Sequence, residues 1–373
     1  LVGFDVKDDK LVIAPRLAEK WDVSEDGKTW TFHLRKGVVF HSGAPFDATA
    51  VKKNFDRLIG GNYKRTSLFK PILSEVRVVD PQTVQFILSQ SFGPFIHTMC
   101  HTAGLIIDPT LIDSKAEIKK NPSGTGPFKF VNWQKGDNIT VMAFDKYREG
   151  KPKVDTVVFM TIPDDNARTM QLETGELDIA ERIATFEVER LKKNADIKLT
   201  IQPGMRVMYV AINAQHPILK DMRIRQAFNY AVDRAAICAN IMKGFAHPID
   251  SPMAFAVNGY APVKGYTYDP AKAKALLAEA GWKDSDGDKI LDKDGKKLEV
   301  TFWSPSGRYP MDYKVAEAIQ AYLKAVGADV KLSTMDWAAF LSETSRKPEE
   351  TKSQMILMGG SPSTGDADWV LRP

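Results

Sequence analysis

The sequence predicts an α/β fold with more than one hydrophobic core, and three observations lead to this prediction. The chain has 373 residues, a length that typically divides into two or three domains. Hydrophobic residues make up 43% of it and charged residues 26%, a composition typical of globular proteins and too apolar for intrinsic disorder. Strand patterns alternate with helix patterns along the chain, which favours sheets covered by helices.

The first part of the chain is rich in strand signals. Residues 29–34 alternate apolar and polar side chains, as a half-buried strand does, and a turn at residues 25–28 precedes them. Residues 121–127 carry Pro and Gly and predict a loop. The other predicted elements are a helix over 48–58, a hairpin over 76–88 with its turn at Asp80-Pro81, and strands over 128–133 and 139–144.

From Pro152 the pattern changes, and candidate domain boundaries lie there and near Ser251. Asp221 begins a helical pattern of apolar residues that continues to a stop at Gly244. The remaining predicted strands cover 154–162, 177–180, 205–213, 298–303, 330–335 and 355–358, and the remaining helices cover 167–175, 271–280 and 315–326. This alternation again indicates an α/β arrangement with short loops.

Charge and motifs exclude several functions. Lys and Arg number 51 against 47 Asp and Glu, and no segment concentrates the positive charge that nucleic-acid binding requires. Apolar runs such as 355–358 are far too short for membrane insertion. The sequence contains no nucleophile elbow, phosphate loop or HExxH zinc motif, so we expect neither catalysis nor a cofactor.

Three residues form a possible metal site. If their segment is helical, His97 and His101 lie one turn apart, and with the Cys100 thiolate they could bind nickel, copper or zinc. No further ligand is identifiable, and the simpler interpretation is two unrelated histidines. The second cysteine, Cys238, lies far away in a helical pattern, where a buried structural thiol is expected.

The acidic segment 284–294 resembles a calcium loop. Asp284, Asp286 and Asp288 alternate along it, which lets several carboxylate oxygens converge on one cation. Lys289 and Gly295, however, stand where the EF-hand pattern requires Gly and Glu. A solvated turn before the strand over 298–303 is the alternative interpretation.

Two loops follow predicted strands, where ligands of open α/β sheets gather. The loop 304–310 carries Arg308, whose planar guanidinium suits a carboxylate. The loop 361–369 carries Asp366, which offers a counter-charge to an ammonium group. The pair could hold a zwitterion by both ends, or the two residues could pair with each other or cap helices.

Several segments together resemble one family, the extracellular solute-binding proteins that capture dipeptides, oligopeptides, glutathione or nickel complexes for ABC importers. The resemblance covers essentially the whole chain. The matching segments are 18–38, Gly124-Thr125-Gly126-Pro127-Phe128, 223–232, Tyr268-Asp269-Pro270-Ala271-Lys272-Ala273 and Gly307-Arg308-Tyr309-Pro310.

The resemblance implies a bilobal periplasmic-binding-protein fold of type II, with a Venus-flytrap motion and an extra small domain. Residues 1–152 would form that small domain of lobe I, 153–250 the core of lobe I, and 251–373 lobe II. Members of the family are normally longer at both ends, so we expect this sequence to be a fragment lacking both termini of the full fold.

The resemblance also implies a set of ligand-binding residues. Arg308 matches a position that often meets a peptide carboxylate, and Asp366 matches the acid that pairs with the ligand's amino terminus. The other residues expected around the ligand are Tyr309, Gly365, Trp369, Met99 and His101. Residues 363–369 are similar to glutathione-type members, whereas 308–310 are similar to dipeptide-type members, so the subfamily stays open.

The function implied by the resemblance is the capture of a short peptide, or a similar small zwitterion, by lobe closure. The protein would deliver it to the permease subunits of an ABC importer from the periplasm, or from the cell surface as a lipoprotein. The alternative within the family is a receptor for nickel or a metallophore, with His97, Cys100 or His101 as ligands.

Overall fold

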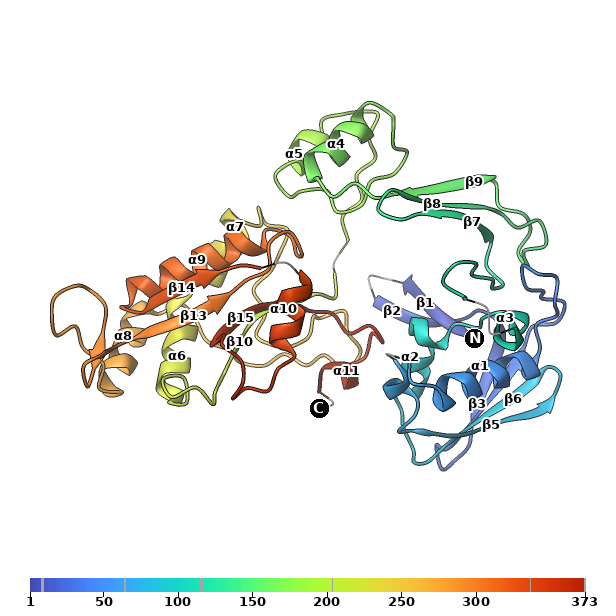
Figure 1. The fold of residues 1–373 in the computed structure, drawn as a ribbon, viewed down its shortest axis with the longest axis horizontal. Coiled ribbons are helices and arrows are strands. Elements are labelled where there is room, and N and C mark those ends of the chain that lie inside the picture. The colour runs from blue at the N-terminus through green and yellow to red at the C-terminus, as the bar shows by residue number, and fades with distance from the viewer. Residues whose placement is uncertain (8–9, 64, 115–116, 203, 336, 372–373) are drawn as a thin grey trace. The chain divides into compact units, whose positions relative to one another are not determined.

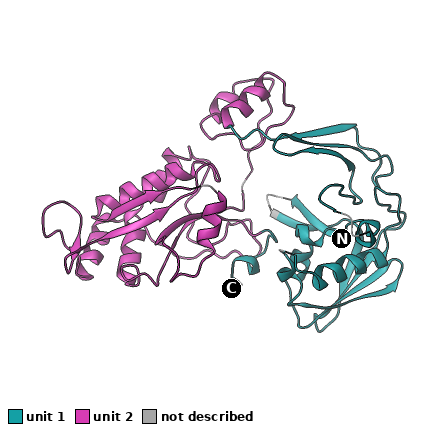
Figure 2. Ribbon diagram, in the orientation of Figure 1, with its two compact units in different colours: residues 1–164, 363–373 teal, residues 165–362 magenta. Residues whose placement is uncertain are grey.

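The computed structural model describes residues 1–7, 10–63, 65–114, 117–202, 204–335 and 337–371. The chain divides into two compact units, and each is described by itself below. Figure 2 colours the first unit, Leu1–Asp164 with Ser363–Pro373, teal and the second unit, Asp165–Pro362, magenta. Within the described ranges, no helix is long and apolar enough to cross a membrane.

The first unit is built on a four-stranded antiparallel sheet in the order β3-β4-β6-β5. Figure 1 labels three of these strands, β3, β5 and β6. Its central strands place every second side chain in the core, and Phe32 and Phe86 meet edge to face at 5.4 Å between ring centroids. The strands are β3 (Ala18–Val23), β4 (Thr29–Leu34), β5 (Leu73–Asp80) and β6 (Thr83–Leu88).

Helix α1 (Ala48–Gly60) packs against this sheet through an apolar stripe. The Asp47 carboxylate caps its first turn by accepting the N–H of Ala50, and Phe55 lies 4.8 Å from the ring of Phe86. The short helices of the unit are the 3₁₀ turns η1 (Thr66–Leu68) and η2 (Thr102–Gly104) and the α-helices α2 (Phe95–Met99), α3 (Pro109–Asp113) and α11 (Asp368–Leu371).

Two smaller sheets complete the first unit. One is an antiparallel hairpin, and the other is a three-stranded antiparallel meander in which β8 pairs with both neighbours. The hairpin consists of β1 (Val2–Lys7) and β2 (Lys10–Pro15), and the meander of β7 (Phe128–Gln134), β8 (Asn138–Ala143) and β9 (Thr156–Met160). Since β9 pairs with β8, the unit continues beyond the boundary suggested near Pro152.

The second unit contains a mixed sheet in the order β10-β15-β13-β14. Strand β13 is parallel to β14 and β15, whereas β10 is antiparallel to β15. The sheet strands are β10 (Val207–Ile212), β13 (Glu299–Trp303), β14 (Asp329–Ser333) and β15 (Met355–Gly360), and β11 (Asp292–Lys293) pairs with β12 (Lys296–Lys297) in a separate short hairpin.

Helices complete the second unit, and its core brings side chains of the mixed sheet together with those of several helices. Val300 and Phe302 of β13 are fully buried there, as is Leu323. The helices are α4 (Asp165–Glu173), α5 (Val188–Leu191), α6 (Met222–Ala231), α7 (Arg234–Asn240), α8 (Pro270–Glu279), α9 (Asp312–Ala325) and α10 (Trp337–Thr344).

Most predicted elements are present, and two predictions are wrong. The strand predicted over 177–180 is irregular chain, with the Ile179 side chain 83% exposed. The helix predicted from Asp221 to Gly244 is two helices, because Val232 is extended and the Asp233 carboxylate caps α7 by accepting the N–H of Ala236. Strand β10 shares a sheet with β15, so the boundary suggested near Ser251 falls inside one unit, and the lobe assignments stay predictions.

Candidate functional site

Asp366 is a buried carboxylate in the loop that enters α11 of the first unit. Its side chain is 9% exposed, and its Oδ1 accepts the backbone N–H of Asp368 at 2.9 Å. Its Oδ2 lies 3.6 Å from Nδ1 of His97 on α2. Because burying a carboxylate is costly, such a position favours a polar or cationic neighbour.

His97 is the imidazole that faces this carboxylate. Burial lowers the pKa of His97, and the charge of Asp366 acts in the opposite direction with a smaller effect. The net direction favours a neutral ring near pH 7. Its Nδ1 is shielded from solvent and has no hydrogen-bond partner in the described part of the chain.

Two residues close to Asp366 in the chain, Trp369 and Gly365, pack against other parts of the first unit. The Trp369 ring stacks on His101, with centroids 5.6 Å apart and planes inclined by 20°. The guanidinium carbon of Arg65 lies 5.1 Å from the Trp369 ring. Gly365 has φ +66°, and a Cβ there would lie 3.1 Å from Phe4, so the turn requires glycine for backbone conformation and for space.

Met99 and His101 differ in their surroundings. Met99 is 1% exposed and belongs to the core of the first unit. His101 is 6% exposed, and its Nδ1 accepts the N–H of Ala103 at 2.9 Å. Burial lowers the pKa of His101, and the nearby charge of Arg65 lowers it further. Ligand contact by either residue therefore stays a prediction.

In the second unit, Arg308 and Tyr309 lie in the loop between β13 and α9, as the sequence predicts. Tyr309 is 6% exposed and meets Trp337 edge to face at 6.0 Å. The guanidinium carbon of the exposed Arg308 lies 4.8 Å from the Trp337 ring and 5.7 Å from the Tyr309 ring. These aromatic contacts hold the cation at the surface of the unit.

The backbone of this loop is fixed by Asp312, which sequence reasoning missed. The carboxylate is 3% exposed and accepts the N–H groups of Gly307, Arg308, Tyr309 and Tyr313 at 2.8–3.0 Å. One sequence signal could have indicated that Asp312 accepts these N–H groups. It is an acidic residue at the start of a helix, three to five residues after the loop positions whose N–H groups it accepts.

Arg206, just before β10, is a second residue that the sequence pattern did not single out. Its guanidinium carbon lies 5.2 Å from the Tyr309 ring centroid. About a hundred residues separate it from Tyr309, and only the pairing of β10 with β15 brings this part of the chain into the same sheet. Nothing local in the sequence indicates that contact.

The predicted metal ligands are turned toward different partners. Helix α2 ends at Met99 and His101 has extended backbone, so the one-turn spacing expected of His97 and His101 does not apply. The Cys100 Sγ donates to the carbonyl of Ile96 at 3.5 Å, and burial raises the pKa of its thiol to about 11. A protonated thiol is a poor metal ligand.

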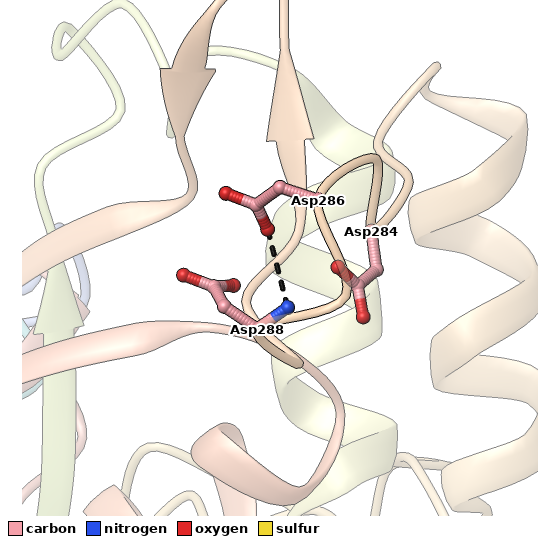
Figure 3. Close-up of side chains that lie close together, drawn as sticks. All are labelled: Asp284, Asp286 and Asp288. Carbon is pink, nitrogen blue, oxygen red and sulfur yellow. Dashed lines mark hydrogen bonds between the residues drawn. The ribbon is translucent and has the colours of Figure 1, made fainter.

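The acidic loop of the second unit does bring its carboxylates together (Figure 3). Asp284, Asp286 and Asp288 offer oxygens within 4.8 Å of one another, and all three are exposed. Their oxygens also accept backbone N–H groups of the loop, and the Lys297 ammonium pairs with Asp288 and lies 3.9 Å from Asp286. That cation already offsets part of the acidic charge, and calcium binding stays a prediction.

Comparisons with known proteins find similarity over nearly the whole chain. Residues 12–373 match the model of the bacterial extracellular solute-binding proteins, family 5 Middle. The chain is 34% identical to the glutathione-binding protein GsiB of Pectobacterium atrosepticum, over 100% of this chain and 70% of GsiB.

Solved structures show the same similarity. The oligopeptide-binding protein AppA from Bacillus subtilis, in complex with a nonapeptide, is 30% identical with a TM-score of 0.81, over 96% of this chain and 73% of AppA. NikZ from Campylobacter jejuni, in complex with Ni(L-His), is 27% identical with a TM-score of 0.83, over 99% of this chain and 73% of NikZ.

Proposed function

Because the chain belongs to family 5 of the bacterial extracellular solute-binding proteins, we propose that it captures a short peptide and delivers it to an ABC importer. The names of relatives support a peptide as ligand, since GsiB is a glutathione-binding protein and AppA is solved with a nonapeptide. Family members bind solutes for transport and are not enzymes. The proposal places the protein outside the cytoplasm, in the periplasm or as a surface lipoprotein, with permease subunits as partners.

The observation that carries the proposal is the buried carboxylate of Asp366 beside a histidine that burial keeps neutral. A peptide's amino terminus is a cation that can donate hydrogen bonds to such a carboxylate. In a position shielded from water, an ammonium–carboxylate pair is stronger than the same pair at the surface. We assign Asp366 to the amino end of the ligand.

The other residues that we propose to bind the ligand belong partly to the first unit and partly to the second. Trp369, Gly365, Met99 and His101 would contact the ligand from the first unit, and Tyr309 from the second. Arg308 is assigned to the ligand carboxylate, because its guanidinium is exposed and steadied by Trp337. The proposal includes closure of two lobes over the peptide, which excludes water without any chemical step.

A nickel complex is the second candidate ligand, supported by the similarity to NikZ, which is solved with Ni(L-His). The candidate ligands for it are His97, Cys100 or His101. Replacing His101 by Gln tests this alternative in a titration with Ni(II)–L-histidine. An unchanged affinity would remove it.

Replacement of Asp366 by Asn tests the assignment of the amino end. The variant keeps shape and hydrogen-bonding capacity but loses the charge, so we expect binding of Ala-Ala-Ala to weaken by about thirtyfold or more. N-acetyl-Ala-Ala-Ala lacks the ammonium group, and its affinity should change by less than about threefold.

Isothermal titration calorimetry measures both affinities. The matched control is Asp368→Asn, which removes one negative charge two residues away and should affect both peptides little. Equal losses for the free and the acetylated peptide would show that Asp366 does not hold the amino end.

A further inference from the structure

Two arginines of the second unit approach one tyrosine ring. The guanidinium carbons of Arg206 and Arg308 lie 5.2 and 5.7 Å from the ring centroid of Tyr309. One arginine comes from the chain just before β10 and the other from the loop after β13. The tertiary fold, rather than local sequence, therefore places two positive charges around one side chain.

Neither of these two charges is paired with an acid within the described residues, because the nearby Asp312 carboxylate accepts backbone N–H groups of the loop instead. Neither guanidinium forms an ion pair there, and the hydrogen bond recorded for the Arg206 side chain goes to the carbonyl of Gly359 at 3.5 Å. Several other arginines of the unit do have carboxylate partners, among them Arg190, Arg223, Arg234 and Arg346.

The Tyr309 ring that both cations approach is held in place by its neighbours. A Cβ on Gly359 would lie 2.7 Å from Cε1 of Tyr309, so the ring lies directly on the backbone of β15. Trp337 packs against the ring edge, and the loop backbone around Tyr309 is fixed by the carboxylate of Asp312. Two positive charges near one fixed ring, without acidic partners, favour the binding of an anion.

We propose that Arg206 is a second anion-binding residue and that the ligand carries two carboxylates at the end that Arg308 holds. The substrate class is then short peptides with an acidic residue at the carboxyl terminus, which present a side-chain and a terminal carboxylate together. Two guanidinium groups can each take one carboxylate through paired N–H donors. This inference rests on the proposed peptide-binding function and adds specificity to it.

Calorimetric titration with Ala-Ala-Glu and Ala-Ala-Gln tests the inference, because the two peptides have nearly the same shape and differ by one carboxylate. We expect the unmodified protein to bind Ala-Ala-Glu about tenfold or more tightly. Arg206→Gln should reduce that preference to less than about threefold. Arg206→Lys should keep part of the preference, since it retains the charge but not the planar fork.

Lys198→Gln is the matched control, because it removes one positive charge from an exposed position of the same unit. Thermal unfolding of each variant shows whether it is folded. Equal binding of the two peptides by the unmodified protein, or a preference that survives in Arg206→Gln, would overturn the inference and leave peptide binding intact. If neither peptide binds, the proposed function fails and the inference fails with it.

Discussion

At the scale of single residues, Asp312 determines the conformation of the loop that carries Arg308 and Tyr309. Its buried carboxylate accepts hydrogen bonds from the backbone of three loop residues and from the first turn of α9. The N–H groups involved would otherwise lack acceptors close to the core. The geometry of the arginine side chain thus depends on a residue that does not contact ligand in our proposal.

Replacing Asp312 by Ala should lower the free energy of unfolding by about 2–4 kcal/mol, because several N–H groups lose their acceptor at once. Glu317→Ala on the same helix is the control. Its carboxylate pairs with Lys314 at the surface, so the expected change is within about 0.5 kcal/mol. Urea unfolding followed by circular dichroism measures both, and equal stabilities of the two variants would contradict this role.

Sequence patterns identify individual site residues only where a local signal exists. Arg308 and Asp366 are conspicuous because each stands in a loop after a strand, and the structure confirms strands β13 and β15 before those loops. The contact of His97 with Asp366 and that of Arg206 with Tyr309 depend on chain segments far apart in sequence. No local pattern contains this information.

At the scale of elements, strand β15 ends in two glycines with different surroundings. A Cβ on Gly359 would lie 2.7 Å from the Tyr309 ring, whereas one on Gly360 would lie 3.3 Å from the ring of Tyr209. The first ring is buried and enclosed by neighbours, and the second is 45% exposed and free to shift. The Tyr309 ring can therefore pack directly on the backbone of β15 only because residue 359 has no side chain.

We expect Gly359→Ala to lower stability by about 1–3 kcal/mol, as overpacking of a filled site does. Gly360→Ala should cost less than about 1 kcal/mol, because the Tyr209 ring can move. Thermal unfolding of the two variants, each paired with a titration of Ala-Ala-Glu, checks the difference. A larger loss of stability in Gly360→Ala would contradict this account of β15.

Helices and strands are predicted from this sequence better than contacts between distant residues are. Alternation along β4 and β6 and the apolar stripe of α9 are local properties, and the structure confirms all three elements. The break between α6 and α7 was missed, although Asp233 offered a capping signal inside the apolar pattern. The strand predicted over 177–180 fails because a short apolar run does not by itself supply a pairing partner.

At the scale of the whole molecule, the two units have separate hydrophobic cores. The core of the second unit runs from Leu219 to Leu357 and lies entirely within the continuous segment Asp165–Pro362. The first unit is discontinuous, since it includes Ser363–Pro373. Chain length predicts more than one core, and the resemblance places the passages between domains near residues 152 and 250, an assignment that stays a prediction.

This division predicts that residues 165–362 fold on their own. We expect that segment to unfold in one cooperative urea transition, because its sheet and its core are complete within it. The control is a segment ending at residue 297, which lacks β13, β14 and β15 and should show no cooperative transition. A non-cooperative transition in the longer segment would show that its core depends on the first unit.

The central claim is that this protein binds short peptides by their free amino end. Native mass spectrometry of the full chain tests it most directly, after incubation with Ala-Ala, Ala-Ala-Glu, glutathione, the N-acetylated form of each and Ni(II)–L-histidine. We predict abundant complexes with the free peptides and much weaker retention of the acetylated ones. Retention of the nickel complex alone, equal retention of acetylated peptides, or no peptide complex at all would contradict the account.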